Sequence, residues 1–199
     1  MPNWCNNELT ISHADPAMMA RFEAAFKEGR MLNEFIPVPQ ELRDTLAGYA
    51  PEGYERELHE ATEALNLKYF GYKNWYDFCV NEWGTKWDVG GNDAYISEDF
   101  DGSIHVSFES AWAPPVPAYE IMVEMGFKIK AFYYESGCNF AGRFVNGEDC
   151  CYDLPETWEE ARAILPDDLI DVFDLEENYR IEEEIVTEEL EHEAPAKNP

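Results

Sequence analysis

The feature that most constrains the fold is the tryptophan-rich run Asn74–Asp88, which holds three of the chain's six tryptophans. Trp75, Phe78 and Trp83 fall at i, i+3 and i+8, on one face of a helix. The first residue of the run is typical of a helix N-cap, and Gly84 is typical of the left-handed residue that follows a helix. Buried indoles contribute large apolar areas, and each indole N–H needs an acceptor. The run therefore predicts a helix anchored on a sheet, followed by an extended segment.

A second interpretation is that part of this run lines a surface pocket. Trp87 is then the most exposed member, because it lies between Lys86 and Asp88. Glu135 is the best candidate for a site carboxylate; the alternative is a structural role, in which it accepts an indole N–H or pairs with Lys86. The candidate binding cluster comprises Trp75, Tyr76, Asp77, Trp83, Lys86, Trp87, Asp88, Trp112 and Glu135.

Strand and helix patterns follow each other in the rest of the chain. Trp4–Ser12 and Ile104–Ser110 alternate apolar and polar side chains, as half-buried antiparallel strands do. The Asp15–Pro16 pair predicts the start of a helix, and a second helix is expected over Val116–Met125. Asn146–Gly147 predicts a type I′ hairpin turn.

These patterns divide the chain into segments. Without residues 31–92, the order is strand–helix–strand–strand–helix–strand, which is the ferredoxin-like βαββαβ pattern. We therefore expect an α+β fold with a ferredoxin-like domain at residues 1–153, in which residues 31–92 form a helical insertion. An acidic, mainly helical extension occupies residues 154–192, and residues 193–199 form a disordered tail. Within the insertion, two prolines predict that residues 31–40 are extended rather than helical.

The chain is strongly acidic, with 42 Asp and Glu against 14 Lys and Arg and a net charge of −28. Residues 148–199 hold 19 acidic and three basic side chains, which is more than half of the excess. Binding to a phosphate backbone is disfavoured, because it depends on clustered basic side chains. The expected partner is a host protein with a basic surface, and mimicry of nucleic acid is one way to bind it.

The acidic residues expected on one helix of the extension form a candidate mimic face. They are Asp167, Asp168, Asp171, Asp174, Glu176 and Glu177. The alternative is a solvated helix face that only adds solubility.

Several functional classes lack their sequence signatures. No run of about 18 apolar residues occurs, which disfavours a membrane span, and Met1–Trp4 has no signal-peptide character. A cytoplasmic location in a bacterial host cell is therefore expected. The five cysteines have no C-x-x-C spacing, and the histidines have no metal-ligand spacing. Nucleophile-elbow and phosphate-loop motifs are missing, so we expect no cofactor, no metal and no catalytic residue.

A set of short motifs spans residues 3–145 in order. They are Asn3–Asn7, Phe35–Pro39, Asn74–Asp77, Trp83–Asp88, Phe108–Pro115, Tyr134–Gly137 and Phe140–Gly142. With these motifs, the chain resembles the YubB-like ferredoxin-domain family of phages and conjugative plasmids. That family has no assigned function, so the resemblance implies a fold and a mobile-element origin but no activity. The acidic extension after Glu156 lies outside the resemblance.

Four functional hypotheses follow. The first is a non-enzymatic mobile-element protein that binds a host protein and inhibits a defence or nucleic-acid enzyme. The second is a small-ligand-binding protein or an enzyme with a tryptophan-lined pocket. The third is single-strand binding on the sheet, with Phe132 and Tyr133 as a stacking platform. The fourth is a structural or oligomer-forming role, in which the extension covers a partner subunit through Leu169, Ile170 and Phe173; the alternative is that it folds back on its own domain.

Overall fold

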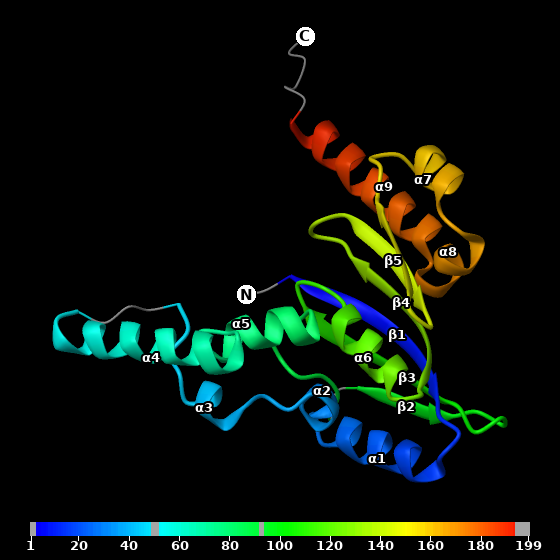
Figure 1. The fold of residues 1–199 in the computed structure, drawn as a ribbon. Coiled ribbons are helices and arrows are strands. Elements are labelled where there is room, and N and C mark those ends of the chain that lie inside the picture. The colour runs from blue at the N-terminus through cyan, green and yellow to red at the C-terminus, as the bar shows by residue number, and fades with distance from the viewer. Residues whose placement is uncertain (1–2, 49–51, 92–93, 194–199) are drawn as a thin grey trace.

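A six-stranded antiparallel sheet forms the centre of the molecule (Figure 1). The computed structural model describes residues 3–48, 52–91 and 94–193. The sheet has the strand order β2-β3-β1-β4-β5-β6. Its strands are β1 (Trp4–Ser12), β2 (Tyr95–Glu98), β3 (Ile104–Ala111), β4 (Lys128–Glu135), β5 (Phe140–Val145) and β6 (Glu148–Asp153). The chain is thus of mixed α+β class.

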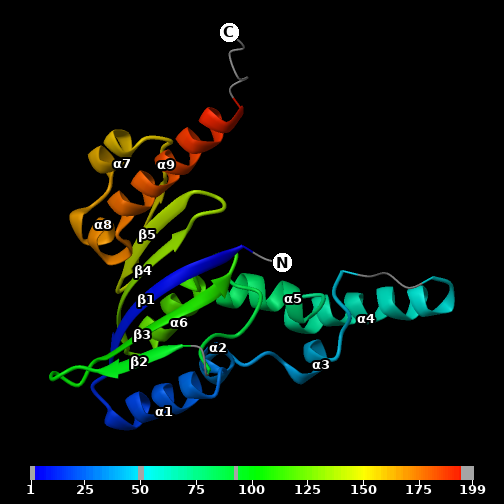
Figure 2. The ribbon, with the colours of Figure 1, turned by 180° about the vertical axis from the view of Figure 1, so that it is seen from behind.

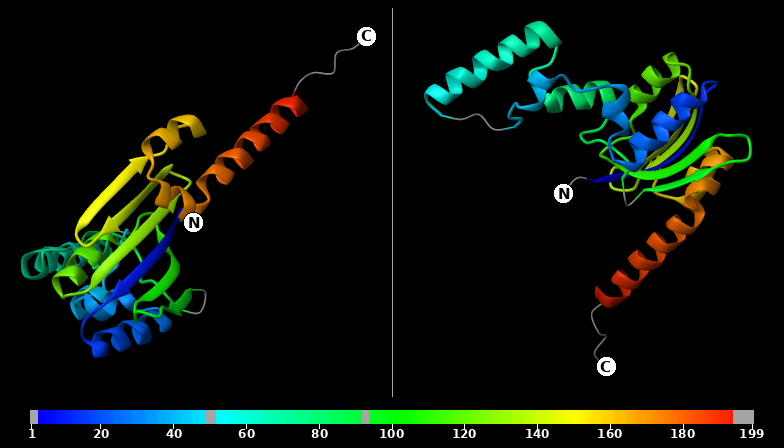
Figure 3. Two further views of the ribbon diagram at one scale, coloured as in Figure 1. Left: turned by 90° about the vertical axis from the view of Figure 1, so that its right-hand side faces the viewer. Right: turned by 90° about the horizontal axis from the view of Figure 1, so that it is seen from below.

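Helices lie on both faces of this sheet (Figure 3). The helices before the second strand are α1 (Pro16–Lys27), α2 (Met31–Phe35), α3 (Gln40–Arg43), α4 (Tyr54–Phe70), α5 (Trp75–Phe78) and the π-helical turn η1 (Cys79–Trp83). The later helices are α6 (Val116–Glu124), α7 (Trp158–Ile164), α8 (Asp167–Phe173) and α9 (Leu175–Glu193). No helix in the described ranges combines the length and the apolar character that a membrane span needs.

The first hydrophobic core lies between the sheet and helices α1, α2, α5 and α6, and we call the sheet face toward it the inner face. Because side chains alternate along a strand, Leu9 and Ile11 of β1 point into this core, as do Val106 of β3 and Ile129 of β4. The rings of Phe26 and Phe108 meet edge to face with centroids 5.9 Å apart. This core fixes the positions of the sheet and of the tryptophan-rich segment.

A second, smaller core lies on the opposite, outer face, where α7, α8 and α9 cover β4 and β5 (Figure 2). Phe132 and Ala141 contribute from the strands, and Leu169 and Leu175 contribute from the helices. The stacking platform predicted from Phe132 and Tyr133 is therefore wrong, because the two side chains are 7% and 1% exposed and point to opposite faces of β4. The outer face of β1, β3 and β2 carries no helix in the described structure.

Several local predictions are confirmed. The Asp15 side chain accepts the N–H of Ala17 at 2.9 Å at the start of α1. Asn146 and Gly147 both have positive φ, 48° and 104°, as a type I′ turn requires. The hairpin β5–β6 surrounds this turn, and α6 matches the helix expected over Val116–Met125 to within one residue.

The prediction that residues 31–40 are extended is wrong in its first half, because α2 occupies Met31–Phe35. The prolines at 37 and 39 come after the last turn, so they do not interrupt its hydrogen bonds. A residue distant in the sequence stabilises the first turn of α2, because the Asp88 carboxylate accepts the N–H groups of Leu32 and Asn33. Of the tail expected at residues 193–199, residues 194–199 lie outside the described residues.

Candidate functional site

The first half of the tryptophan-rich run belongs to the first core. Asn74 caps α5, and its Oδ1 accepts the N–H of Asp77 at 3.0 Å. Trp83 is 4% exposed and donates its indole N–H to the Ile36 carbonyl oxygen at 2.9 Å. Gly84 has φ +83°, and a Cβ there would lie 2.5 Å from the Pro117 ring. This half of the candidate cluster therefore anchors the helix, and Trp83 is closed to a ligand.

Two predicted site carboxylates are engaged by backbone N–H groups. Asp88 accepts the N–H of Leu32 at 2.7 Å and that of Asn33 at 3.0 Å, while burial raises the pKa of the Asp88 carboxyl. Glu135 is 1% exposed and accepts the N–H groups of Gly137 at 2.7 Å and Cys138 at 2.6 Å. The Glu135 carboxylate is thus bound by the backbone of its own turn, where the sequence had suggested an indole N–H or Lys86.

The partly exposed members of the cluster gather around Lys86. Its Nζ lies 4.7 Å from the centroid of the Trp87 ring, 5.2 Å from that of Trp112 and 5.9 Å from that of Tyr76. Trp87 and Trp112 are each 40% exposed. Trp75 meets the Tyr76 ring edge to face and packs against the first core. The Lys86 ammonium group therefore already occupies the space between these rings.

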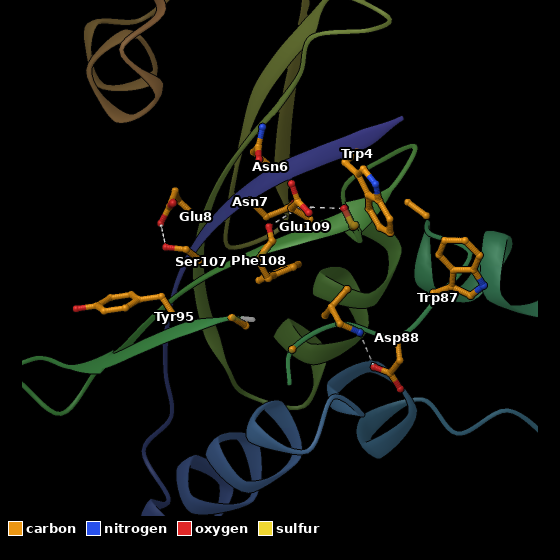
Figure 4. Close-up of a pocket in the computed structure, with 15 residues that line it drawn as sticks. Trp4, Asn6, Asn7, Glu8, Trp87, Asp88, Tyr95, Ser107, Phe108 and Glu109 are labelled. Carbon is orange, nitrogen blue, oxygen red and sulfur yellow. Dashed lines mark hydrogen bonds between the residues drawn. The ribbon is translucent and has the colours of Figure 1, made fainter. Parts of the chain in front are cut away.

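The structure has a cleft whose lining matches the predicted pocket only in part (Figure 4). It has a volume of about 450 Å³ and lies between β3 and the segment 87–90. Of the predicted cluster, the lining includes Trp87 and Asp88. The lining residues that sequence reasoning missed include Trp4, Asn6, Glu8, Tyr95, Ser107 and Glu109. The sequence did offer one indication of these residues. Every second side chain of a strand points to the same face, so the polar residues that alternate with the apolar ones lie together on the outer face.

The predicted acidic face does not lie on one helix. Asp174, with φ +49°, separates α8 from α9. Asp168 is turned to the sheet, 3.2 Å from Arg143 and 3.6 Å from Lys130. Asp167 pairs with Arg162 at 2.7 Å, and Glu177 pairs with Arg180. The other three members, Asp171, Asp174 and Glu176, form no ion pair within the described structure.

The beginning of helix α9 is packed against the rest of the molecule. Leu175 and Tyr179 are buried in the second core, and the Tyr179 hydroxyl donates to the Pro155 carbonyl oxygen at 2.7 Å. Every side chain from Arg180 to Ile185 is exposed. Figures 1 and 3 show the helix continuing away from the sheet. The stretch Arg180–Ile185 of α9 is thus exposed to solvent directly after the buried beginning of the helix.

Within the described residues, no three His, Cys, Asp or Glu side chains come together in a group that could hold a metal ion. Cys150 and Cys151 are adjacent and exposed, and they point to opposite faces of β6.

Comparisons with known proteins add one structural similarity. No family model matches the chain, and no curated protein matches it. Among solved structures, protein api92 from Yersinia pseudotuberculosis, of family DUF1281, is similar with a TM-score of 0.43 and 9% sequence identity. The alignment covers 78% of this chain and 99% of that chain.

Proposed function

We propose that this chain is a non-catalytic binding protein whose acidic helix α9, with α8 beside it, docks on a basic surface of a host protein. The observation that carries this proposal is the solvent-exposed stretch Arg180–Ile185 on a buried base. Ile181 and Ile185 are 43% and 52% exposed and lie one turn apart, beside exposed carboxylates. A helix with an apolar stripe and acidic flanks suits a groove with a basic rim.

A target that binds nucleic acid fits this chemistry, because such proteins present clustered basic side chains. An acidic helix that occupies the same surface excludes the nucleic acid. The high negative net charge of the chain also raises its rate of association with a basic partner. Inhibition of a defence or nucleic-acid enzyme is the corresponding biological role. It agrees with the mobile-element origin that the sequence motifs imply.

We also infer that β1–β4 with α1 and α6 form a ferredoxin-like unit. The supporting observation is the order β2-β3-β1-β4 together with both helices on the inner face. β5, β6 and the three last helices are then additions to that unit, and α2–η1 is the insertion.

The test uses tagged full-length protein to capture a partner from a bacterial host lysate, followed by affinity measurement with the purified partner. The variant Glu176→Gln/Glu182→Gln/Glu184→Gln removes three exposed carboxylates of α9. We expect the affinity to fall by about tenfold or more, because each lost charge contact weakens a charged interface by up to about 1 kcal/mol. A nucleic acid that binds the partner should compete with the wild-type chain.

A matched control removes three carboxylates from α4, which also leaves the body of the molecule (Figure 2). Glu55→Gln/Glu57→Gln/Glu60→Gln makes the same change in net charge at exposed helix positions. Each triple contains one carboxylate paired with an arginine four residues before it, at 2.8 Å for Glu60 and 2.9 Å for Glu184. Equal losses from the two triples would show diffuse charge attraction and would refute a dedicated surface on α9.

The second function, small-ligand binding or catalysis in a tryptophan-lined pocket, is favoured by one observation, the cleft beside β3. Its two tryptophans are Trp4 and Trp87, with ring centroids 5.9 Å apart. Quenching of tryptophan fluorescence by a panel of nucleotides and metabolites tests this second function. If no compound of the panel changes the fluorescence, small-ligand binding in the cleft is refuted.

A further inference from the structure

Helix α4 carries a stripe of exposed apolar side chains. Its members are spaced by three and four residues, so they share one face of the helix, and they are Leu58, Ala61, Leu65 and Tyr69. The two leucines are 58% and 55% exposed, and the tyrosine is 69% exposed. The more buried side chains of α4, such as Asn66, lie on a different face, where the Asn66 Nδ2 donates to the Lys73 carbonyl oxygen at 3.0 Å. The stripe therefore faces solvent.

The helix that carries this stripe is an arm. Figures 1 and 2 show α4 extending away from the sheet, with its beginning at the far end and its last turn toward α5. Its 17 residues give it a length of about 25 Å. A helix of this length is marginal in water without tertiary packing of its apolar face. Contiguous exposed apolar side chains mark a contact with another molecule.

Two charged side chains beside the stripe indicate which molecule this is. Glu57 and Lys68 are 11 residues apart, which is close to three helical turns, so they lie on the same flank of the stripe. Both are exposed, and neither forms an ion pair within the described residues. Arg56 and Glu60, by contrast, pair with each other at 2.8 Å. One flank of α4 thus has an unpaired negative group near its beginning and an unpaired positive group near its end.

We propose that α4 pairs with α4 of a second copy of this chain, antiparallel about a two-fold axis. That axis is perpendicular to both helices, so the same flank of each helix faces its equivalent on the other, and opposite ends meet. One register brings three pairs together, because each is centred within one residue of position 63: Leu58 with Tyr69, Ala61 with Leu65, and Glu57 with Lys68. Each pair occurs twice in the dimer.

The antiparallel direction also keeps the acidic bodies of the two chains apart. Each chain has a net charge of −28, which opposes association. The body joins α4 at its last turn, so antiparallel pairing places the two bodies at opposite ends of the paired helices. That separation exceeds the Debye length of about 8 Å at physiological salt. A parallel pair would bring both bodies to one end and both copies of Glu57 to the other. The pairing goes beyond the proposed function and does not use α9.

Sedimentation velocity of the full-length chain, from about 1 to 500 μM at physiological salt, tests the pairing. We expect a reversible monomer–dimer equilibrium with a Kd of about 10–100 μM, because one helix per chain gives an interface at the small end of specific interfaces. Leu65→Ser should raise this Kd by about tenfold or more, since the dimer loses two apolar side chains at its centre. A wild-type chain that stays monomeric over this range would overturn the proposal.

The matched control is Leu67→Ser on the same helix. Leu67 is 51% exposed, close to the value for Leu65, but it lies outside the stripe. It should change the Kd by less than about twofold, and circular dichroism checks that both variants keep their helix content. Equal losses from Leu65→Ser and Leu67→Ser would assign the dimer to unspecific apolar contact and would overturn the pairing of the stripes.

Charge reversal tests the direction and register of the pair. Glu57→Lys places like charges opposite each other twice in the dimer, and so does Lys68→Glu. Each variant alone should dimerise about tenfold more weakly or less well still. An equal mixture of the two variants should dimerise about as well as the wild-type chain, because opposite charges again face each other at both positions. A mixture no better than its components would overturn the antiparallel register.

The same measurement separates this pairing from the proposed role of α9. The triple variant Glu176→Gln/Glu182→Gln/Glu184→Gln should dimerise with a Kd within about twofold of the wild-type value, and loss of its dimer would move the contact from α4 to α9. Conversely, the partner affinity that tests α9 is measured at nanomolar concentrations of this chain. Because these lie far below the expected Kd, α4 is unpaired there and changes in α4 pairing do not affect the result.

Discussion

The outer face of the sheet has two halves that differ in cover. On β4 and β5, Phe132, Tyr134 and Ala141 lie under α7, α8 and α9. On β1 and β3, the same face carries Glu8 and His105 with other polar side chains, and no helix covers it in the described structure. The extension therefore covers the sheet where the strands carry apolar side chains on both faces, and it leaves the polar part of the outer face open.

The uncovered half is stabilised by cross-strand contacts instead of burial. Glu8 lies 2.9 Å from His105 and accepts the Ser107 hydroxyl. Thr10 and the other ring nitrogen of His105 are 3.3 Å apart. These cross-strand contacts leave the cleft beside β3 open to solvent. In the covered half, the exposed charged side chains lie on α9. The α9 surface and the cleft of the second proposed function therefore belong to different halves.

The largest expected contrast concerns thiol chemistry on the two sheet faces. Burial raises the pKa of the inner-face Cys5 to about 12, so about one in ten thousand of these thiols is ionised at pH 8. Cys150 points to the outer face and is exposed. With iodoacetamide at pH 8, we expect Cys150 to be alkylated and Cys5 to react only after unfolding, as measured by peptide mass spectrometry. Rapid alkylation of native Cys5 would contradict a closed inner face.

In the covered half, Leu169→Ala should lower the free energy of unfolding by about 2–5 kcal/mol, because it leaves a cavity in the second core. Leu169 is fully buried there. The control on the same helix is Val172→Ala, which removes a side chain that is 40% exposed and should change stability by less than about 0.5 kcal/mol. Urea denaturation measures both. Similar values for the two variants would mean that α8 is not packed on the sheet.

At the border of the uncovered half, Gly90→Ala should destabilise the chain by about 1–3 kcal/mol, since the new methyl group meets the Phe26 carbonyl oxygen and φ is positive. Gly102→Ala isolates the cost of positive φ, because Gly102 has φ +80° and no atom within 4 Å of the added Cβ. Thermal and urea denaturation give the difference. Equal losses of stability for the two variants would show that the close approach of Gly90 to the Phe26 carbonyl oxygen adds no cost of its own.

The smallest effect is expected within the uncovered half. A double-mutant cycle with Glu8→Gln and His105→Gln should give a coupling free energy of about 0.2–1 kcal/mol, which decreases with added salt. The reason is that both side chains are partly open to solvent, 27% for Glu8 and 34% for His105. A coupling above about 2 kcal/mol in urea denaturation would contradict the distinction between polar and apolar halves.

Much of the local structure was predictable because its causes lie within a few residues. The Asn74 cap, the Asp15 cap and the Asn146–Gly147 turn each depend on side chains next to the backbone that they fix. The α2 helix was missed because its cap, Asp88, comes from a distant part of the chain. The acidic face was misplaced because the left-handed Asp174 breaks one expected helix into two.

The candidate site was less predictable than the elements around it. Trp87 was expected at a surface pocket, but Trp4 beside it was assigned only to a strand. Their contact at 5.9 Å depends on pairing of β1 with β3 and on the path of the segment 87–90. No local pattern in either segment encodes that pairing.

By itself, the sequence determined the alternating strands, the helix caps, the turns and the acidic balance, because each follows from residue type and short spacing. Only the folded chain shows which half of the outer face is covered, which tryptophans are closed in the core, and which distant residues line the cleft beside β3. The physical reason is that burial and electrostatic environment arise from side chains far apart in the chain, which only the folded sheet brings together.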